Sequence, residues 1–236
     1  MVECVRMINA KDEERGGIAV TFEELCTRSE SEWQLIRQHP FVLALGKGDL
    51  PLEKFRYFIG QDGAYLKDFS RVLATLAALA PDSTAARIML RHADTVFSVE
   101  QSLHDSVGEQ MGLRALDLQN VTPGFITKTY QDHLVRAVGE GSFITGLAAV
   151  LPCYWTYAAL GRELNQNGKP DNPLLAEWID TYASEGYQSS VQEVGALWES
   201  YSGDVPSTHV LEVYDWSMTY ERLFWEQAWQ LGIKLD

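Results

Sequence analysis

Residues 141–161, GSFITGLAAVLPCYWTYAALG, contain no charged side chain and constrain the fold more than any other stretch of the chain. Such a segment is long enough to cross a lipid bilayer as a helix. It also contains Gly, Ser, Thr, Pro and Tyr, and no other segment resembles it. We therefore expect a helix buried at the centre of a soluble fold rather than a membrane span.

Helical patterns surround this segment. A capping threonine opens a helix over 21–38 that stops at Pro40, and Pro51 opens the next helix, which runs to Pro81. Asp82 or Ser83 caps a third helix that extends to about Gly112. The remaining helices are expected near 123–138, 141–165, 172–184, 186–202 and 207–231.

The breaks between these helices are short, and no alternating run indicates a strand. The sequence therefore predicts an all-α fold, a single-domain helical bundle over residues 20–236. Residues 1–19 are polar and are expected to form a poorly ordered arm.

Charge and cysteine content limit the partners and the compartment. The chain has 33 acidic against 19 basic residues, a net charge of −14, which repels nucleic acid and anionic membranes. Cys4, Cys26 and Cys153 are odd in number and form no CxxC motif, so a disulfide framework is not expected. Together with an N-terminus that lacks a signal-peptide pattern, this indicates a reducing compartment, the cytoplasm.

Two acidic residues interrupt apolar helix faces. Asp62 has Phe58 and Leu66 one turn away on either side, and Glu221 has Trp225 in the same relation. A carboxylate buried without a partner is costly. Each acid is therefore either part of an internal ion network or part of a functional site, and the pattern alone leaves both interpretations open.

Cys153 follows a proline inside the uncharged stretch. Pro152 cannot donate a backbone hydrogen bond to residue 148, so a kink is expected there, and Tyr157 lies one turn further on the same face. Cys153 is thus a candidate nucleophile, although most buried cysteines are small apolar packing residues. Tyr130 and Tyr182 are further candidates, with core packing as the alternative.

A metal site is not expected. The histidines are scattered, and the chain has no Glu-x-x-His motif of the kind that di-iron bundles require. Glu100 and His104 share a helix face but lack the further ligands. No glycine-rich phosphate loop and no zinc pattern occurs either, so we expect no cofactor.

Four motifs together resemble one protein family. They are QDxxYLxxF, LPCYWxYxxxG, WIxxYxSxxY and a terminal YExxFW, found here as QDGAYLKDF, LPCYWTYAALG, WIDTYASEGY and YERLFW. In this order the chain resembles the thiaminase II (TenA) family over about residues 20–232. The resemblance implies a haem-oxygenase-like fold without haem, and a homotetramer.

The resemblance also implies roles for residues within these motifs. Cys153 matches the family's nucleophile, Glu221 its acid/base, and Asp62 the aspartate that holds the aminopyrimidine. The substrate-binding tyrosines that the resemblance implies are Tyr65, Tyr130, Tyr157 and Tyr182.

The expected function is that of an aminopyrimidine aminohydrolase. By analogy with the family, the chain would hydrolyse 4-amino-5-aminomethyl-2-methylpyrimidine to 4-amino-5-hydroxymethyl-2-methylpyrimidine in thiamin salvage, with thiamin as a second candidate substrate. Two alternatives stay open from the sequence. One is a non-catalytic pyrimidine-binding or regulatory protein, and the other is a haem-oxygenase-like oxidase.

Overall fold

The computed structural model describes residues 20–96, 121–203 and 206–233. The expected N-terminal arm, residues 1–19, lies outside these ranges, and so do Cys4, Glu100 and His104. The extension of the third helix beyond residue 96 also falls outside them.

Helices make up the described part of the chain, which contains no strand. Residues 83–96 are helical as well. The other helices are α1 (Phe22–Arg28), α2 (Glu30–Arg37), α3 (Pro40–Lys47), α4 (Leu52–Leu79), α7 (Phe125–Gly139), α8 (Phe143–Gln166), α9 (Pro173–Ala183), α10 (Glu185–Tyr201) and α11 (Thr208–Gln230). The all-α prediction is confirmed.

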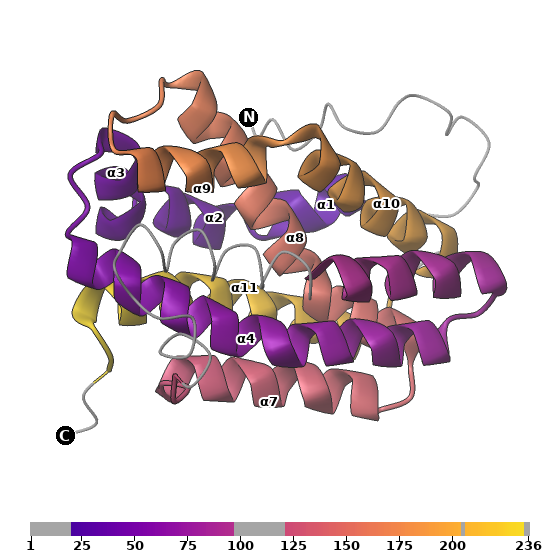
Figure 1. The fold of residues 1–236 in the computed structure, drawn as a ribbon. Helices are drawn as coiled ribbons and strands as arrows, with labels where there is room; N and C mark the ends of the chain where they lie inside the picture. Colours follow the sequence, from indigo (N-terminus) through magenta and orange to yellow (C-terminus); the bar gives the residue numbers. More distant parts are fainter. Residues whose placement is uncertain (1–19, 97–120, 204–205, 234–236) are drawn as a thin grey trace.

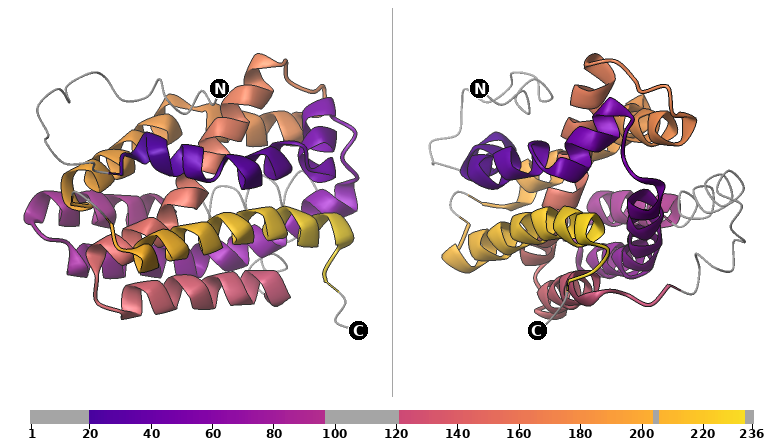
Figure 2. Two further views of the ribbon diagram at one scale, coloured as in Figure 1. Left: turned by 180° about the vertical axis from the view of Figure 1, so that it is seen from behind. Right: turned by 90° about the vertical axis from the view of Figure 1, so that its left-hand side faces the viewer.

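The uncharged stretch forms most of α8, which crosses the middle of the molecule. Its N-terminal end lies near α7 and its C-terminal end near α9 (Figures 1 and 2), and it also packs against α4, α10 and α11. Although α8 is long and apolar enough for a membrane span, 89% of its most apolar 18-residue window is buried inside the protein. The expectation of a buried central helix is therefore confirmed.

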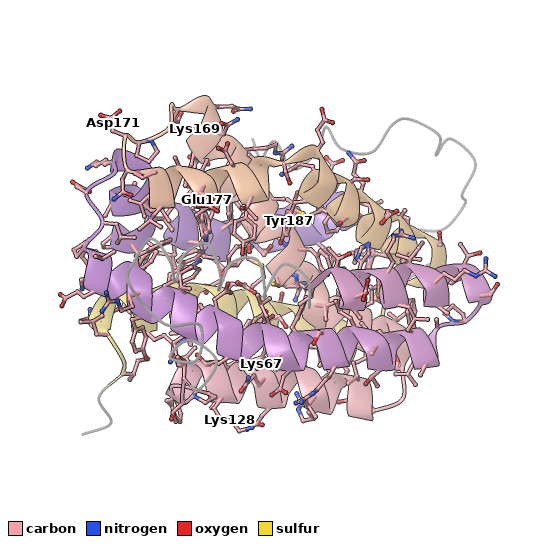
Figure 3. All side chains as sticks on the ribbon, viewed as in Figure 1. Lys67, Lys128, Lys169, Asp171, Glu177 and Tyr187 are labelled. Carbon is pink, nitrogen blue, oxygen red and sulfur yellow. The ribbon has the colours of Figure 1, made fainter. Side chains whose placement is uncertain are left out.

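Charged side chains lie on the outside of this bundle. Lys128 on α7 and Lys169 after α8 point away from the core (Figure 3), and each pairs with a nearby aspartate at the surface. Helices with apolar inner faces surround α8 on several sides, and the buried carboxyl groups of Asp62 and Glu221 are exceptions to this pattern.

The expected single helix over 21–38 is wrong, because the chain breaks at Ser29. Its side-chain hydroxyl donates to the Leu25 carbonyl and also contacts the Tyr214 hydroxyl at 3.1 Å. Its backbone ψ angle of 14° departs from α-helical geometry, which separates α1 from α2. A serine that bonds to its own backbone competes with the helix in this way.

Pro40 begins a helix, α3, that the sequence pattern does not predict. It occupies the first position of α3, where its missing N–H is not needed, and the His39 side chain accepts a hydrogen bond from the Phe41 N–H at 3.2 Å. The left-handed Gly48, with φ of 81°, ends the helix. The sequence predicts that Pro40 only ends a helix, whereas in the structure it also starts one.

Close approach between α8 and α9 depends on Gly161. A Cβ atom at this position would lie 2.6 Å from the Tyr182 carbonyl carbon, which is backbone and cannot move aside easily. We predict that Gly161→Ala lowers the free energy of unfolding by roughly 1–3 kcal/mol, as overpacking does.

Urea denaturation checks this, with Gly139→Ala as the matched control, because a Cβ at Gly139 meets nothing within 4 Å. Equal stability of the Gly161→Ala variant and the unsubstituted chain would contradict the close approach.

Candidate active site

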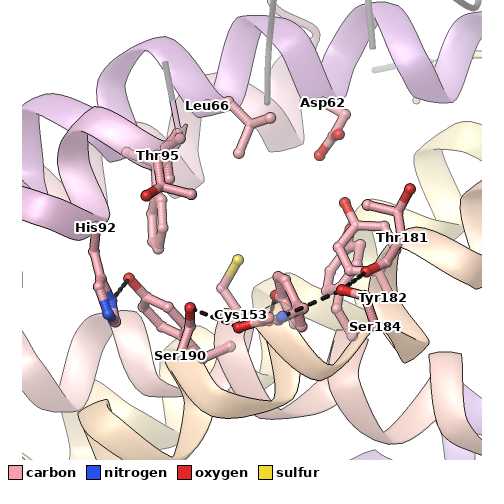
Figure 4. A pocket seen from close by; sticks show the side chains of 15 residues that line it. Asp62, Leu66, His92, Thr95, Cys153, Thr181, Tyr182, Ser184 and Ser190 are labelled. Carbon is pink, nitrogen blue, oxygen red and sulfur yellow. Dashed lines mark hydrogen bonds between the residues drawn. The ribbon is translucent and has the colours of Figure 1, made fainter. Parts of the chain in front are cut away.

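A cavity of about 450 Å³ lies between α4, the helix over 83–96, α8, α9 and α10. This volume falls within the range of small-molecule pockets, ~300–1,000 Å³. Of the residues that the sequence singled out, the cavity wall contains Asp62, Cys153, Tyr157 and Tyr182 (Figure 4). Residues from three separate helices therefore meet around one space.

Asp62 enters this space from α4. Asp62 is 3% exposed, as its place on an apolar helix face predicts. Its carboxylate points into the cavity opposite Cys153 (Figure 4). The aromatic rings of Tyr157 and Tyr182 pack with centroids 4.8 Å apart, and Trp178 packs on Tyr182 at 4.6 Å. The Asp62 carboxylate therefore lies near packed aromatic rings. A cavity with a carboxylate and aromatic rings can bind a flat polar heterocycle.

Cys153 points its thiol into the middle of the cavity (Figure 4). Burial raises the pKa of this thiol well above its usual range, the charge of Glu221 raises it further, and the nearby Tyr65 hydroxyl partly offsets both effects. Asp62 adds a smaller effect that also raises the pKa. The group is therefore a neutral thiol near pH 7 and needs a base before it can attack.

The helix continues without interruption through Pro152. The Pro152 carbonyl accepts a hydrogen bond from the Thr156 hydroxyl at 2.8 Å, and the Cys153 carbonyl accepts one from the Tyr187 hydroxyl at 3.4 Å. Tyr187 belongs to α10. These side chains add hydrogen bonds beside the cysteine, where the proline has removed a backbone donor.

Glu221 is buried on α11 at 2% exposure and accepts a hydrogen bond from the Tyr130 hydroxyl at 2.6 Å. Burial raises the pKa of Glu221 to about 8; the Tyr130 hydrogen bond lowers it, and the charge of Asp62 raises it. Near neutral pH this carboxyl is therefore mostly protonated and can either give or take a proton.

Glu221, Tyr65 and Tyr130 lie next to the cavity, because Glu221 and Tyr65 both act on the Cys153 thiol and Tyr130 donates a hydrogen bond to Glu221. The Tyr65 and Tyr130 rings pack at 5.0 Å between centroids. Burial, followed by the charge of Cys153, raises the pKa of Tyr65; burial, followed by the charge of Glu221, raises that of Tyr130. The two tyrosines thus stand between the thiol and the carboxyl.

Sequence reasoning missed His92 and Tyr154, which line the same cavity. A signal for His92 was present, because its neighbours one turn away, Ile88 and Val96, are apolar. The same pattern, a polar residue with apolar neighbours one turn away, identifies Asp62 in the sequence. Among the described residues, no three His, Cys, Asp or Glu side chains gather in a way that could hold a metal ion.

Comparison with known proteins gives one family. A model of the TENA/THI-4/PQQC family matches residues 27–231. The aminopyrimidine aminohydrolase of Bacillus subtilis is 32% identical over 214 residues, which cover 89% of this chain and 90% of that protein. The aminopyrimidine aminohydrolase of Helicobacter pylori is 28% identical over 210 residues, 87% of this chain and 97% of that protein.

Solved structures agree on the fold. A TenA homologue from P. horikoshii superposes with a TM-score of 0.81 at 28% identity, covering 89% of this chain and 98% of that one. A domain with a haem-oxygenase-like fold from Shewanella denitrificans superposes with a TM-score of 0.68 at 14% identity, over 89% of this chain and 92% of that one. The haem-oxygenase-like prediction is confirmed.

The raised pKa of Glu221 predicts how stability changes with pH. Glu221 keeps its proton up to a pH of about 8 in the folded chain, whereas in the unfolded chain its pKa is the ordinary 4.5. The contribution of this proton to the free energy of unfolding is therefore fully present below pH 4.5 and is lost as the pH rises through about 8. In Glu221→Gln the amide imitates the protonated acid and this loss is absent.

We compare the free energy of unfolding of Glu221→Gln with that of the unsubstituted chain. Relative to the unsubstituted chain, we expect the variant to be roughly 2–5 kcal/mol more stable at pH 9 than it is at pH 4. Urea unfolding at both pH values measures this. Parallel pH profiles for the two proteins would show that Glu221 ionises normally in the folded chain.

Proposed function

The chain belongs to the TENA/THI-4/PQQC family, and we propose that it is an aminopyrimidine aminohydrolase (thiaminase II) of thiamin salvage. Its substrate is 4-amino-5-aminomethyl-2-methylpyrimidine, with thiamin as a second substrate, and its product is 4-amino-5-hydroxymethyl-2-methylpyrimidine. The observation that carries the proposal is the meeting of the Cys153 thiol and the Asp62 carboxylate in one cavity, with Glu221 beside it. The names of the Bacillus subtilis and Helicobacter pylori relatives support the same activity.

The cavity wall suits the substrate ring. The Asp62 carboxylate accepts hydrogen bonds from the exocyclic amine of the pyrimidine, because an ionised carboxylate has acceptors alone. Tyr157 and Tyr182 pack against a face of the ring. This arrangement fixes one ring nitrogen near Asp62 and turns the opposite edge toward Glu221.

The reaction uses the thiol and the second carboxyl group. Glu221 protonates a ring nitrogen, the Cys153 sulfur adds to a ring carbon, and the thiol proton returns to the Glu221 carboxylate by way of Tyr65 and Tyr130. The C–N bond at the 5-methylene then breaks, and the amine leaves with the proton held by Glu221. Water adds at the methylene carbon and gives its proton to the Glu221 carboxylate. The C–S bond then breaks, the sulfur takes back the proton on the ring nitrogen, and the hydroxymethyl product leaves.

Compartment, assembly and domain extent are further parts of the proposal. The protein acts in the cytoplasm, which agrees with Cys26 and Cys153 being thiols rather than disulfides. It forms a homotetramer, for which Val135 and Trp216, each more than half exposed on the neighbouring helices α7 and α11, offer apolar contact surface. Residues 20–236 constitute its single catalytic domain.

Removal of the thiol tests the covalent route. In Cys153→Ala we expect kcat for ammonia release to fall at least about 1,000-fold, because no other group can form the adduct, while the Kd of the pyrimidine product changes little. Cys26→Ala is the matched control, since Cys26 is also a buried cysteine but lies on α1, outside the cavity wall.

Ammonia release and calorimetric titration measure the two quantities. Turnover by Cys153→Ala near the unsubstituted rate would rule out covalent catalysis by this thiol. A chain that binds the aminomethyl substrate but releases no ammonia would be the non-catalytic binding protein.

Replacement of the buried aspartate tests ring binding. Asp62→Asn keeps the size of the side chain but loses the charge that accepts from the exocyclic amine. We expect KM to rise and kcat/KM to fall about 10- to 100-fold, as the loss of a charged hydrogen bond does. Steady-state kinetics on the aminomethyl substrate checks this, and an unchanged KM would exclude Asp62 as the group that holds the ring.

A further inference from the structure

The cavity continues past Cys153, away from Asp62. Figure 4 shows this far end, where His92 and Thr95 come from the helix over 83–96 and Ser190 from α10. Tyr154, the residue after the cysteine on α8, also lines it. The mechanism uses none of these side chains, and they contribute polar groups at the end of the cavity away from Asp62.

Three side chains from three helices form one hydrogen-bonded line at this end. The His92 Nδ1 atom lies 3.0 Å from the Tyr154 hydroxyl, and its Nε2 atom lies 2.8 Å from Glu193 Oε2 (Figure 4 draws the first contact). His92 and Tyr154 are 4% and 5% exposed. Arg91 reaches the other carboxylate oxygen of Glu193 from the surface side at 2.6 Å. We call Glu193, His92 and Tyr154 the Glu–His–Tyr line.

The charge states fix the direction of each hydrogen bond. Burial lowers the pKa of His92 despite the opposing effect of Glu193, so the imidazole is neutral near pH 7. Burial raises the pKa of Glu193, but hydrogen bonds from His92 and Arg91 outweigh it, so this group is a carboxylate. A carboxylate can only accept, so the single imidazole proton lies on Nε2, and Nδ1 must accept from Tyr154.

We propose that the Glu–His–Tyr line makes the Tyr154 oxygen a hydrogen-bond acceptor at the far end of the cavity, where it recognises N–H donors on the 5-methylene substituent of the substrate. Because the Tyr154 proton is held by His92, the oxygen offers its lone pairs to a ligand. Tyr154 thereby determines specificity, and His92 and Glu193 are positioning residues. The inference rests on the proposed function, since it assumes an aminopyrimidine held by Asp62.

Substrate preference follows from this arrangement. An aminomethyl group or its protonated form has N–H donors for the Tyr154 oxygen, and a polarised line behind the phenol strengthens that bond. The quaternary nitrogen of a thiazolium has no N–H. The site therefore favours leaving groups that are amines over leaving groups that are thiazolium rings.

A binding comparison tests the acceptor without requiring turnover. The two probes are 4-amino-5-aminomethyl-2-methylpyrimidine and 4-amino-2,5-dimethylpyrimidine, which lacks the donor, and Cys153→Ala prevents reaction. We expect the aminomethyl compound to bind at least about 10-fold more tightly, and this ratio to fall below about threefold when Tyr154→Phe is added. Phenylalanine keeps the ring and removes only the oxygen.

Two variants of Glu193 test the Glu–His–Tyr line if Tyr154→Phe fails to fold. Glu193 is only half-buried near the surface, so its replacement disturbs the core less than that of Tyr154. Glu193→Gln keeps an oxygen acceptor for His92 Nε2 and should preserve the ratio, whereas Glu193→Leu removes it and should lower the ratio. Arg91→Gln is the matched control, since it removes the outer ion pair and leaves the Glu–His–Tyr line intact. We expect no change in the ratio for this control.

The outcomes separate the inference from the proposed function. The acceptor role of Tyr154 is overturned if the affinity ratio of the two probes is the same in Cys153→Ala with and without Tyr154→Phe. It is also overturned if Cys153→Ala alone binds both probes equally. Absence of ammonia release by the unsubstituted chain, with the binding ratio as expected, contradicts the proposed function and leaves the acceptor standing. Failure of both probes to bind contradicts both.

Discussion

The complete burial of α8 is the constraint on which the rest of the structure depends. A helix with no charge over most of its length must be covered, and α4, α7, α9, α10 and α11 cover it. Each covering helix then turns an inner face toward α8. The burial that stabilises the fold thus also brings Asp62, Glu221 and the tyrosines near one thiol, because they are among the buried polar groups of these helices.

Burial also sets the electrostatics of the site. Removal from water raises the pKa of Cys153 and of Glu221, and each acidic group makes ionisation of the others harder. The cluster therefore tends to hold its protons until a bound molecule supplies donors or acceptors. Tyr130 counteracts part of this effect through its hydrogen bond to Glu221, so the carboxyl can exchange a proton near neutral pH.

Sequence patterns located the central helix and the buried acids, since a lack of charge and a polar residue on an apolar face are both visible along one helix. They failed where tertiary contacts decide. Ser29 breaks a helix through its contact with Tyr214, and Pro40 starts one with help from His39. The pattern could not show that Tyr130 donates a hydrogen bond to Glu221, nor that His92 contacts Tyr154, because such contacts depend on how the helices pack. The roles expected of Cys153, Glu221 and Asp62 came from the family resemblance.

The neutral state of the Cys153 thiol has a consequence for the durability of the protein. Oxidants and alkylating reagents attack thiolates far faster than thiols. Because burial raises the pKa of Cys153, its side chain is in the slowly reacting thiol form near neutral pH. Burial of Cys153 therefore limits irreversible oxidation of its thiol by peroxides.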